Sequence, residues 1–111
     1  MAALVVTAAS CSVAQVRVTV ANRGTLPLED VRVTVSTVTD ELGTLAPKQE
    51  KSCWVRPRGE TGVTITYLAP GGLKVDSGSI GYLEAGYSGS ITFVVDEGGV
   101  QDANWRVNAL F

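Results

Sequence analysis

The stretch Val16-Arg-Val-Thr-Val-Ala-Asn-Arg-Gly24, followed by Asp30-Val-Arg-Val-Thr-Val35, decides the fold of this chain. In both runs valine alternates with a polar residue, which is the pattern of a β-strand with one apolar and one solvent-facing side. The intervening Asn-Arg-Gly is typical of a turn, because Asn and Gly tolerate positive φ angles. The two runs therefore predict amphipathic strands at 14–21 and 30–38, with their valines facing inward.

The same alternation recurs to the end of the chain. Gly- and Pro-bearing turns separate the further strands that we expect, which are 42–45, 50–56, 63–68, 73–76, 79–83, 88–96 and 100–110. No window shows sustained helical spacing, so the sequence predicts an all-β fold, a small antiparallel β-sandwich of seven to nine short strands. The length of 111 residues predicts a single domain, 1–111.

Composition excludes several classes of function. The chain has no histidine and a formal net charge of -2, from nine basic and eleven acidic residues. We therefore expect no enzyme activity, no catalytic residues, no metal or cofactor, and no nucleic-acid partner. No apolar run approaches the roughly 20 residues of a membrane-spanning helix, so we expect no spanning segment.

The densest basic stretch is a local exception to this acidic balance. It contains Lys48, Lys51, Arg56 and Arg58, with Glu50 inside it. The simplest interpretation is a solvated strand and loop, and the alternative is a patch that binds phosphate or lipid.

The N-terminal residues permit two interpretations. Small apolar residues lead up to Cys11 and resemble the tail of a bacterial lipoprotein signal, although Ala8 stands where Leu is usual and no basic residue precedes the stretch. Residues 1–12 are therefore either a leader remnant, with a lipid anchor at Cys11, or they contain the first strand, at 3–8. Cys11 and Cys53 form a disulfide in one alternative and are free thiols in another. A disulfide would favour an extracytoplasmic location, the periplasm or cell surface.

Three stretches carry a resemblance to a known class of module. They are Val16–Gly24, Leu28-Glu-Asp-Val31-Arg-Val33 and Gly43-Thr-Leu45-Ala-Pro47-Lys-Gln49. Together they resemble the small immunoglobulin-like sandwich modules of bacterial envelope proteins, with Lys48 in place of the Gly usual after the proline. The resemblance implies an immunoglobulin-like sandwich that acts as a non-enzymatic binding or structural module of the cell envelope. For this chain we expect recognition of a partner through loops at one end of the sandwich or through an edge strand.

Aromatic residues supply the candidates for a recognition surface. These are Trp54, Tyr67, Tyr82 and Tyr87, together with Arg56. An exposed Trp beside Arg suits a protein partner, and an aromatic platform around Trp54 and Tyr67 would suit a sugar ring. The alternative functions are therefore a protein-binding module and a carbohydrate-binding module, while packing in the core or at its rim is the simpler role for these rings.

The C-terminal run Trp105-Arg-Val-Asn-Ala-Leu-Phe111 alternates and carries no Lys or Pro that would block pairing. An apolar terminal strand of this kind predicts an edge able to pair with a protein partner or with a second copy of the chain. The residues that would form it are Trp105, Val107, Ala109 and Phe111.

Overall fold

The structure is a computed structural model that describes residues 15–109. This part of the chain contains nine β-strands and no helix, within the expected number of strands. The strands are β1 (Val16–Asn22), β2 (Leu28–Val35), β3 (Val38–Leu45), β4 (Glu50–Val55), β5 (Thr61–Ala69), β6 (Leu73–Asp76), β7 (Ile80–Leu83), β8 (Tyr87–Asp96) and β9 (Gly99–Ala109). The expected strand at 3–8, the leader remnant, Cys11 and Phe111 lie outside the described residues.

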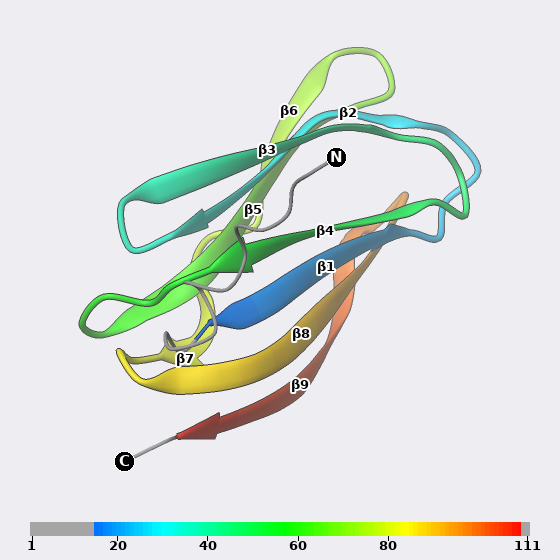
Figure 1. Ribbon diagram of the computed structural model, residues 1–111. Coiled ribbons are helices and arrows are strands. Elements are labelled where there is room, and N and C mark those ends of the chain that lie inside the picture. Colours follow the sequence, from blue (N-terminus) through cyan, green and yellow to red (C-terminus); the bar gives the residue numbers. More distant parts are fainter. Residues whose placement is uncertain (1–14, 110–111) are drawn as a thin grey trace, which may run out of the picture.

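Two sheets lie face to face, which makes the fold a β-sandwich (Figure 1). Sheet A has the strand order β4-β1-β8-β9, and sheet B has the order β3-β2-β5-β6. The short strand β7 also pairs with β5, beyond the end of β6. The edge strands β3 of sheet B and β4 of sheet A follow each other in the chain and lie along the same side of the sandwich, which we call its margin.

The expectation that every strand pair is antiparallel is wrong for the centre of sheet A. There β1 and β8 are parallel, with Val18 opposite Ile91 and Val20 opposite Phe93. Between these two strands the chain passes twice through sheet B, so β8 enters sheet A in the same direction as β1. Parallel neighbours need such a long crossover, whereas antiparallel neighbours can be joined by a short hairpin.

The predicted strand at 30–38 is also corrected, because a tight turn at Ser36 and Thr37 divides it into β2 and the start of β3. Ser36 has a φ of 58°, a conformation that L-residues rarely adopt. Its backbone N–H donates to Thr61 Oγ1 at 2.8 Å, and its Oγ accepts from the backbone N–H of Arg58 at 3.0 Å. These contacts from another loop hold a turn that no Gly, Asn or Pro marks in the sequence.

The core lies between the two sheets, where the alternating residues of the longer strands meet. In β1, β5 and β8 the residues predicted to face inward are buried, namely Val16, Val18, Val20, Val63, Ile65, Tyr67, Ile91, Phe93 and Val95. The largest fully buried side chains include Phe93, Leu45, Ile65, Leu83 and Ile91. Burial of this apolar surface is the main term that stabilises the sandwich.

Asn22 holds the point where the chain leaves sheet A. Its side chain is fully buried, and its Nδ2 donates to the carbonyls of Leu26 and Leu45, each at 3.0 Å. Its Oδ1 accepts from the backbone N–H of Gly24 at 2.9 Å. One amide thus joins the turn after β1 to the end of β3 in the other sheet.

Candidate functional site

The margin between β3 and β4 is closed at one end and open at the other. The two strands are joined by the turn Ala46–Gln49, where the Gln49 side chain accepts from the Ala46 N–H at 2.8 Å. Two residues after this turn, Lys51 Nζ in β4 donates to the carbonyl of Leu42 in β3 at 3.2 Å. Beyond this bond the two strands diverge (Figure 1). Because they belong to different sheets, no backbone ladder joins them there.

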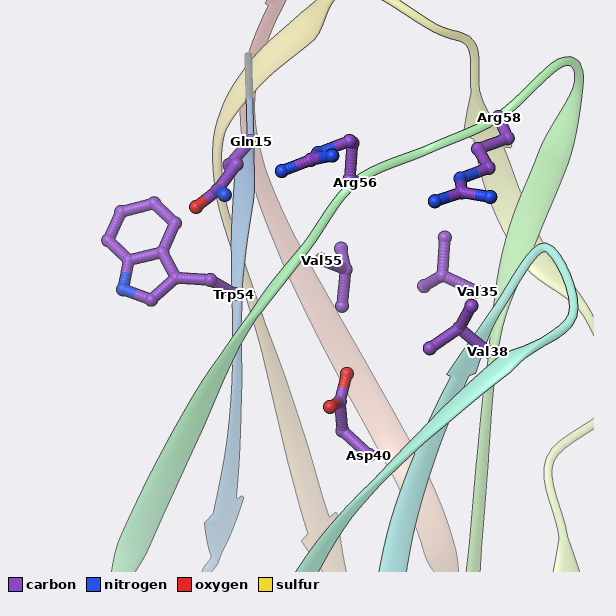
Figure 2. A pocket seen from close by; sticks show the side chains of 8 residues that line it. All are labelled: Gln15, Val35, Val38, Asp40, Trp54, Val55, Arg56 and Arg58. Carbon is purple, nitrogen blue, oxygen red and sulfur yellow. The ribbon is translucent and has the colours of Figure 1, made fainter. Parts of the chain in front are cut away.

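The diverging strands leave a hollow, which we name the margin groove. It is lined by Gln15, Val35, Val38, Asp40, Trp54, Val55, Arg56 and Arg58 (Figure 2). Its volume is about 190 Å³. Sites for drug-sized ligands and cofactors usually measure about 300–1,000 Å³. The margin groove is therefore suited to one or two side chains of a partner rather than to a whole small molecule.

Charge is divided between the two ends of the margin groove. Figure 2 shows Arg56 and Arg58 at one end and Asp40 at the other, with valine side chains between them. Both arginines are exposed, and neither forms an ion pair within residues 15–109. Among the described residues, no carboxylate therefore competes with an anionic group from outside for these two guanidinium groups.

Trp54 stands at the rim of this groove with 60% of its surface exposed. Strand alternation places the neighbouring Val55 in the core and directs Trp54 to the outer face of sheet A. Its register partner on β1 is Arg17, whose side chain is exposed on the same face. Trp54 and Arg56, two residues of the predicted recognition surface, thus line the same groove as Arg58, and Arg17 lies opposite Trp54.

Cys53 lies on the opposite side of β4 from Trp54. It is half-buried and packs against the core. Burial, reinforced by the negative charge of Asp40, raises the pKa of the Cys53 thiol to about 11. Such a thiol is a poor nucleophile at neutral pH, because the thiolate is the reactive form. The predicted disulfide partner and lipid anchor, Cys11, lies outside the described residues.

Tyr67 does not belong to the exposed recognition surface predicted from the sequence. It is only 3% exposed and points into the core from β5 of sheet B. Burial, with a smaller contribution from Asp96, raises the pKa of its phenol. Tyr67 alternates in phase with Val63 and Ile65, so the pattern that buries those residues buries its ring as well. It therefore forms no aromatic platform with Trp54.

The other two predicted tyrosines form a pair of their own. The rings of Tyr82 in β7 and Tyr87 in β8 meet edge to face, with centroids 6.2 Å apart. Tyr82 is 48% exposed, whereas Tyr87 is half-buried. The Tyr82 hydroxyl donates to Glu84 Oε2 at 2.7 Å. This hydrogen bond, with smaller contributions from burial and nearby charges, raises the pKa of Tyr82 to about 12.

The predicted edge strand is β9, which pairs with β8 alone among the described strands. Trp105 and Val107 are half-buried and pack against the core, and the Trp105 ring meets Phe93 edge to face at 6.3 Å. The backbone of Ala109 lies opposite Tyr87. The side chains of Trp105 and Val107 thus stabilise the sandwich, and the surface that β9 offers to a partner is its backbone edge.

A second hollow, not predicted from the sequence, lies at one end of the sandwich. Its volume is about 400 Å³, and it is formed by Asn22, Gly24, Leu26, Leu28, Tyr67, Ala69, Pro70, Leu73, Val75, Asp96, Glu97, Gly98 and Gly99. Two leucines at this hollow are well exposed, Leu26 at 50% and Leu73 at 67%. The residues come from strands and loops far apart in the chain, and no local motif marks them.

Glu97 joins two of these loops. Its Oε2 accepts from the backbone N–H of Thr25 at 2.6 Å and from Thr25 Oγ1 at 2.9 Å. The bond from the backbone N–H is the main reason why the pKa of Glu97 lies below its usual range.

Within residues 15–109, no three His, Cys, Asp or Glu side chains gather as a metal site would require. The same part of the chain holds no helix long and apolar enough to cross a bilayer.

Comparison with known proteins shows the fold alone. No model of a known protein family matches the chain, and no curated protein matches it. Among solved structures, the chain is similar to the NMR structure of a protein from Eubacterium rectale, with a TM-score of 0.56 and 16% sequence identity. The similarity covers 90% of each chain.

Proposed function

We propose that this protein is a non-enzymatic protein-binding module whose recognition surface is the margin groove with Trp54. The observation that carries the proposal is the 60% exposure of Trp54 on an outer strand, beside Arg17 and the groove. Trp and Arg are the residues most enriched at binding hot spots, because both bury a large area on association.

The proposed mechanism is strand addition. Among the described residues β4 pairs only with β1, so its other edge presents unpaired backbone groups. An extended segment of a partner would pair with this edge, cover Trp54 with an apolar residue and insert a side chain into the margin groove. Backbone hydrogen bonds would supply affinity and the groove would supply specificity.

The absence of catalysis is part of the proposal. The sequence has no histidine, and the thiol of Cys53 is held in its protonated form at neutral pH. A general base and an activated nucleophile are the usual requirements for acid–base or covalent catalysis.

We also propose that the sandwich is immunoglobulin-like and belongs to a bacterial cell envelope, at the periplasm or cell surface. Support comes from the three family-like stretches, which fall on β1 and its turn, on β2, and on the end of β3 with the turn Ala46–Gln49. A Cys11–Cys53 disulfide or a lipid anchor at Cys11 would both fit that location.

Carbohydrate binding is the second candidate function. The exposed indole of Trp54 favours it, because a flat aromatic face suits a sugar ring. The burial of Tyr67 removes the second ring of the proposed platform, so Trp54 would have to act without it.

Pairing at β9 is a further route to a protein partner or a second copy. Its 11 residues form the longest strand described, and one edge of its backbone has no neighbour in residues 15–109.

Peptide and glycan arrays on the same protein test the proposal. We expect extended peptides to bind, and Trp54→Ala to abolish binding, while Tyr82→Ala, which removes another exposed aromatic ring, leaves it unchanged. Binding of glycans but not peptides, lost in Trp54→Ala, would replace the proposal with the carbohydrate alternative. Peptide binding that survives Trp54→Ala would show that recognition lies elsewhere.

A further inference from the structure

We infer that the segment recognised at the margin groove is acidic, and that a carboxylate side chain of the partner binds between Arg56 and Arg58. This inference rests on the proposed function, and it names the class of partner. The occupant is an extended peptide segment with an Asp or Glu at the arginine end of the groove.

Charge complementarity is the first argument. The chain as a whole is acidic, with eleven acidic against nine basic residues. Arg23 and Arg32 are paired with Glu50 and Asp30 on other parts of the surface. Arg17, in contrast, lies opposite Trp54 in the register, and Arg56 and Arg58 line the groove. None of these three arginines forms an ion pair within the described part of the chain.

The surroundings of the two groove arginines are the second argument. Between them and Asp40 lie Val35, Val38 and Val55, so one wall of the groove is apolar (Figure 2). A partner that covers these valines would exclude water, which strengthens the attraction between a guanidinium and a carboxylate. Arg can also bind a carboxylate through two parallel hydrogen bonds, an arrangement that Lys does not offer.

Asp40 determines the direction in which the partner segment runs. Its carboxylate lies at the end of the groove away from Arg56 and Arg58 (Figure 2). A second acidic residue of the partner would be repelled there, whereas a neutral or basic residue would be accepted. The groove therefore fixes which way the acidic segment runs along β4, as unlike charges across an interface commonly fix its register.

The test uses three capped peptides of about eight residues, the length of an ordinary strand, in which Val alternates with Glu, Gln or Lys. Binding is measured by isothermal titration calorimetry on the unmodified protein and on Arg56→Gln/Arg58→Gln. The matched control is Lys48→Gln/Lys74→Gln, which removes the same charge from two exposed sites outside the groove. Circular dichroism checks that each variant is folded.

We expect the glutamate peptide to bind at least about tenfold more tightly than the glutamine peptide, and the lysine peptide to bind most weakly. Arg56→Gln/Arg58→Gln should abolish the preference for glutamate, and the control variant should retain it. Asp40→Asn should tighten binding of the glutamate peptide. Raising the salt concentration from about 0.05 M to about 0.5 M should weaken that binding, because exposed charges are screened.

Other outcomes overturn the inference and separate it from the proposed function. If all three peptides bind equally and Trp54→Ala abolishes binding, the groove is a protein-binding site without selection for acid, and only the inference fails. If none of the three peptides binds, both the inference and the strand-addition mechanism fail. If the control variant loses as much affinity as the groove variant, only the inference fails. Binding of anionic lipid vesicles or inorganic phosphate, but not of the glutamate peptide, would reassign the arginines to a phosphate group.

Discussion

The indole of Trp105 in β9 lies directly against the backbone of Gly81 in β7, so close that a methyl group on Gly81 would overlap the ring. The two residues belong to different sheets, at the margin opposite β3 and β4. Gly81 also has a φ of +73°, which glycine adopts without strain. This contact closes one side of the sandwich with a ring, whereas the other side keeps an open groove.

Gly81→Ala should therefore be severely destabilising. Backbone strain at a positive φ costs about 1 kcal/mol or more, and overlap with the ring adds about 1–3 kcal/mol. Chemical denaturation of Gly59→Ala is the matched control, because Gly59 has a φ of +67° but nothing within 4 Å of the added methyl group. Equal losses of unfolding free energy in the two variants would contradict the contact.

The buried amide of Asn22 should be essential for stability. Asn22→Ala removes both hydrogen bonds to the carbonyls of Leu26 and Leu45 and leaves the Gly24 N–H without its acceptor. We expect a loss of about 2–4 kcal/mol in the free energy of unfolding. Asn104→Ala, on the exposed face of β9, should cost less than about 1 kcal/mol. Similar losses would show that the Asn22 bonds contribute little.

The Thr25–Glu97 contact should stabilise the loops at neutral pH and lose that effect in acid. Because the folded pKa of Glu97 lies below its usual value, its contribution is present above the unfolded pKa and is lost as pH falls through the folded pKa. Thermal unfolding should show Glu97→Gln less stable than the unmodified protein at pH 7, with the difference vanishing at strongly acidic pH. A difference that grows on acidification would contradict the lowered pKa.

The reduced thiol of Cys53 should alkylate slowly at neutral pH. Its rate of reaction with iodoacetamide should keep rising until the pH approaches about 11, because the thiolate forms only there. Asp40→Asn removes a neighbouring negative charge, so it should lower the pKa and speed the reaction at a given pH. A rate that levels off near the ordinary pKa of a cysteine would contradict the assignment.

Much of the fold could be predicted from the sequence because alternation reports directly on a half-buried strand. The inward faces of β1, β5 and β8 follow from it, and the burial of Tyr67 follows from the same rule applied to its own strand. The predicted platform of Tyr67 and Trp54 is wrong because the alternation of β5 places the Tyr67 ring on the buried face of its strand.

The remaining features depend on contacts between distant segments. The turn at Ser36 is held by Thr61 and Arg58, and the parallel pairing of β1 with β8 depends on how the chain crosses between sheets. The basic stretch is divided by the fold, because Lys51 bonds to Leu42 across the margin while Arg56 and Arg58 line the groove. No local pattern encodes that separation.

The most direct test of the proposed binding surface is a backbone amide NMR titration of the unmodified protein with the alternating Val–Glu peptide. The account predicts shift changes concentrated on β4, on β3 near Val38 and Asp40, and on Trp54, Arg56 and Arg58. Shift changes confined to β9, or to the loops around Leu26 and Leu73, would contradict it and move the recognition site to another part of the sandwich.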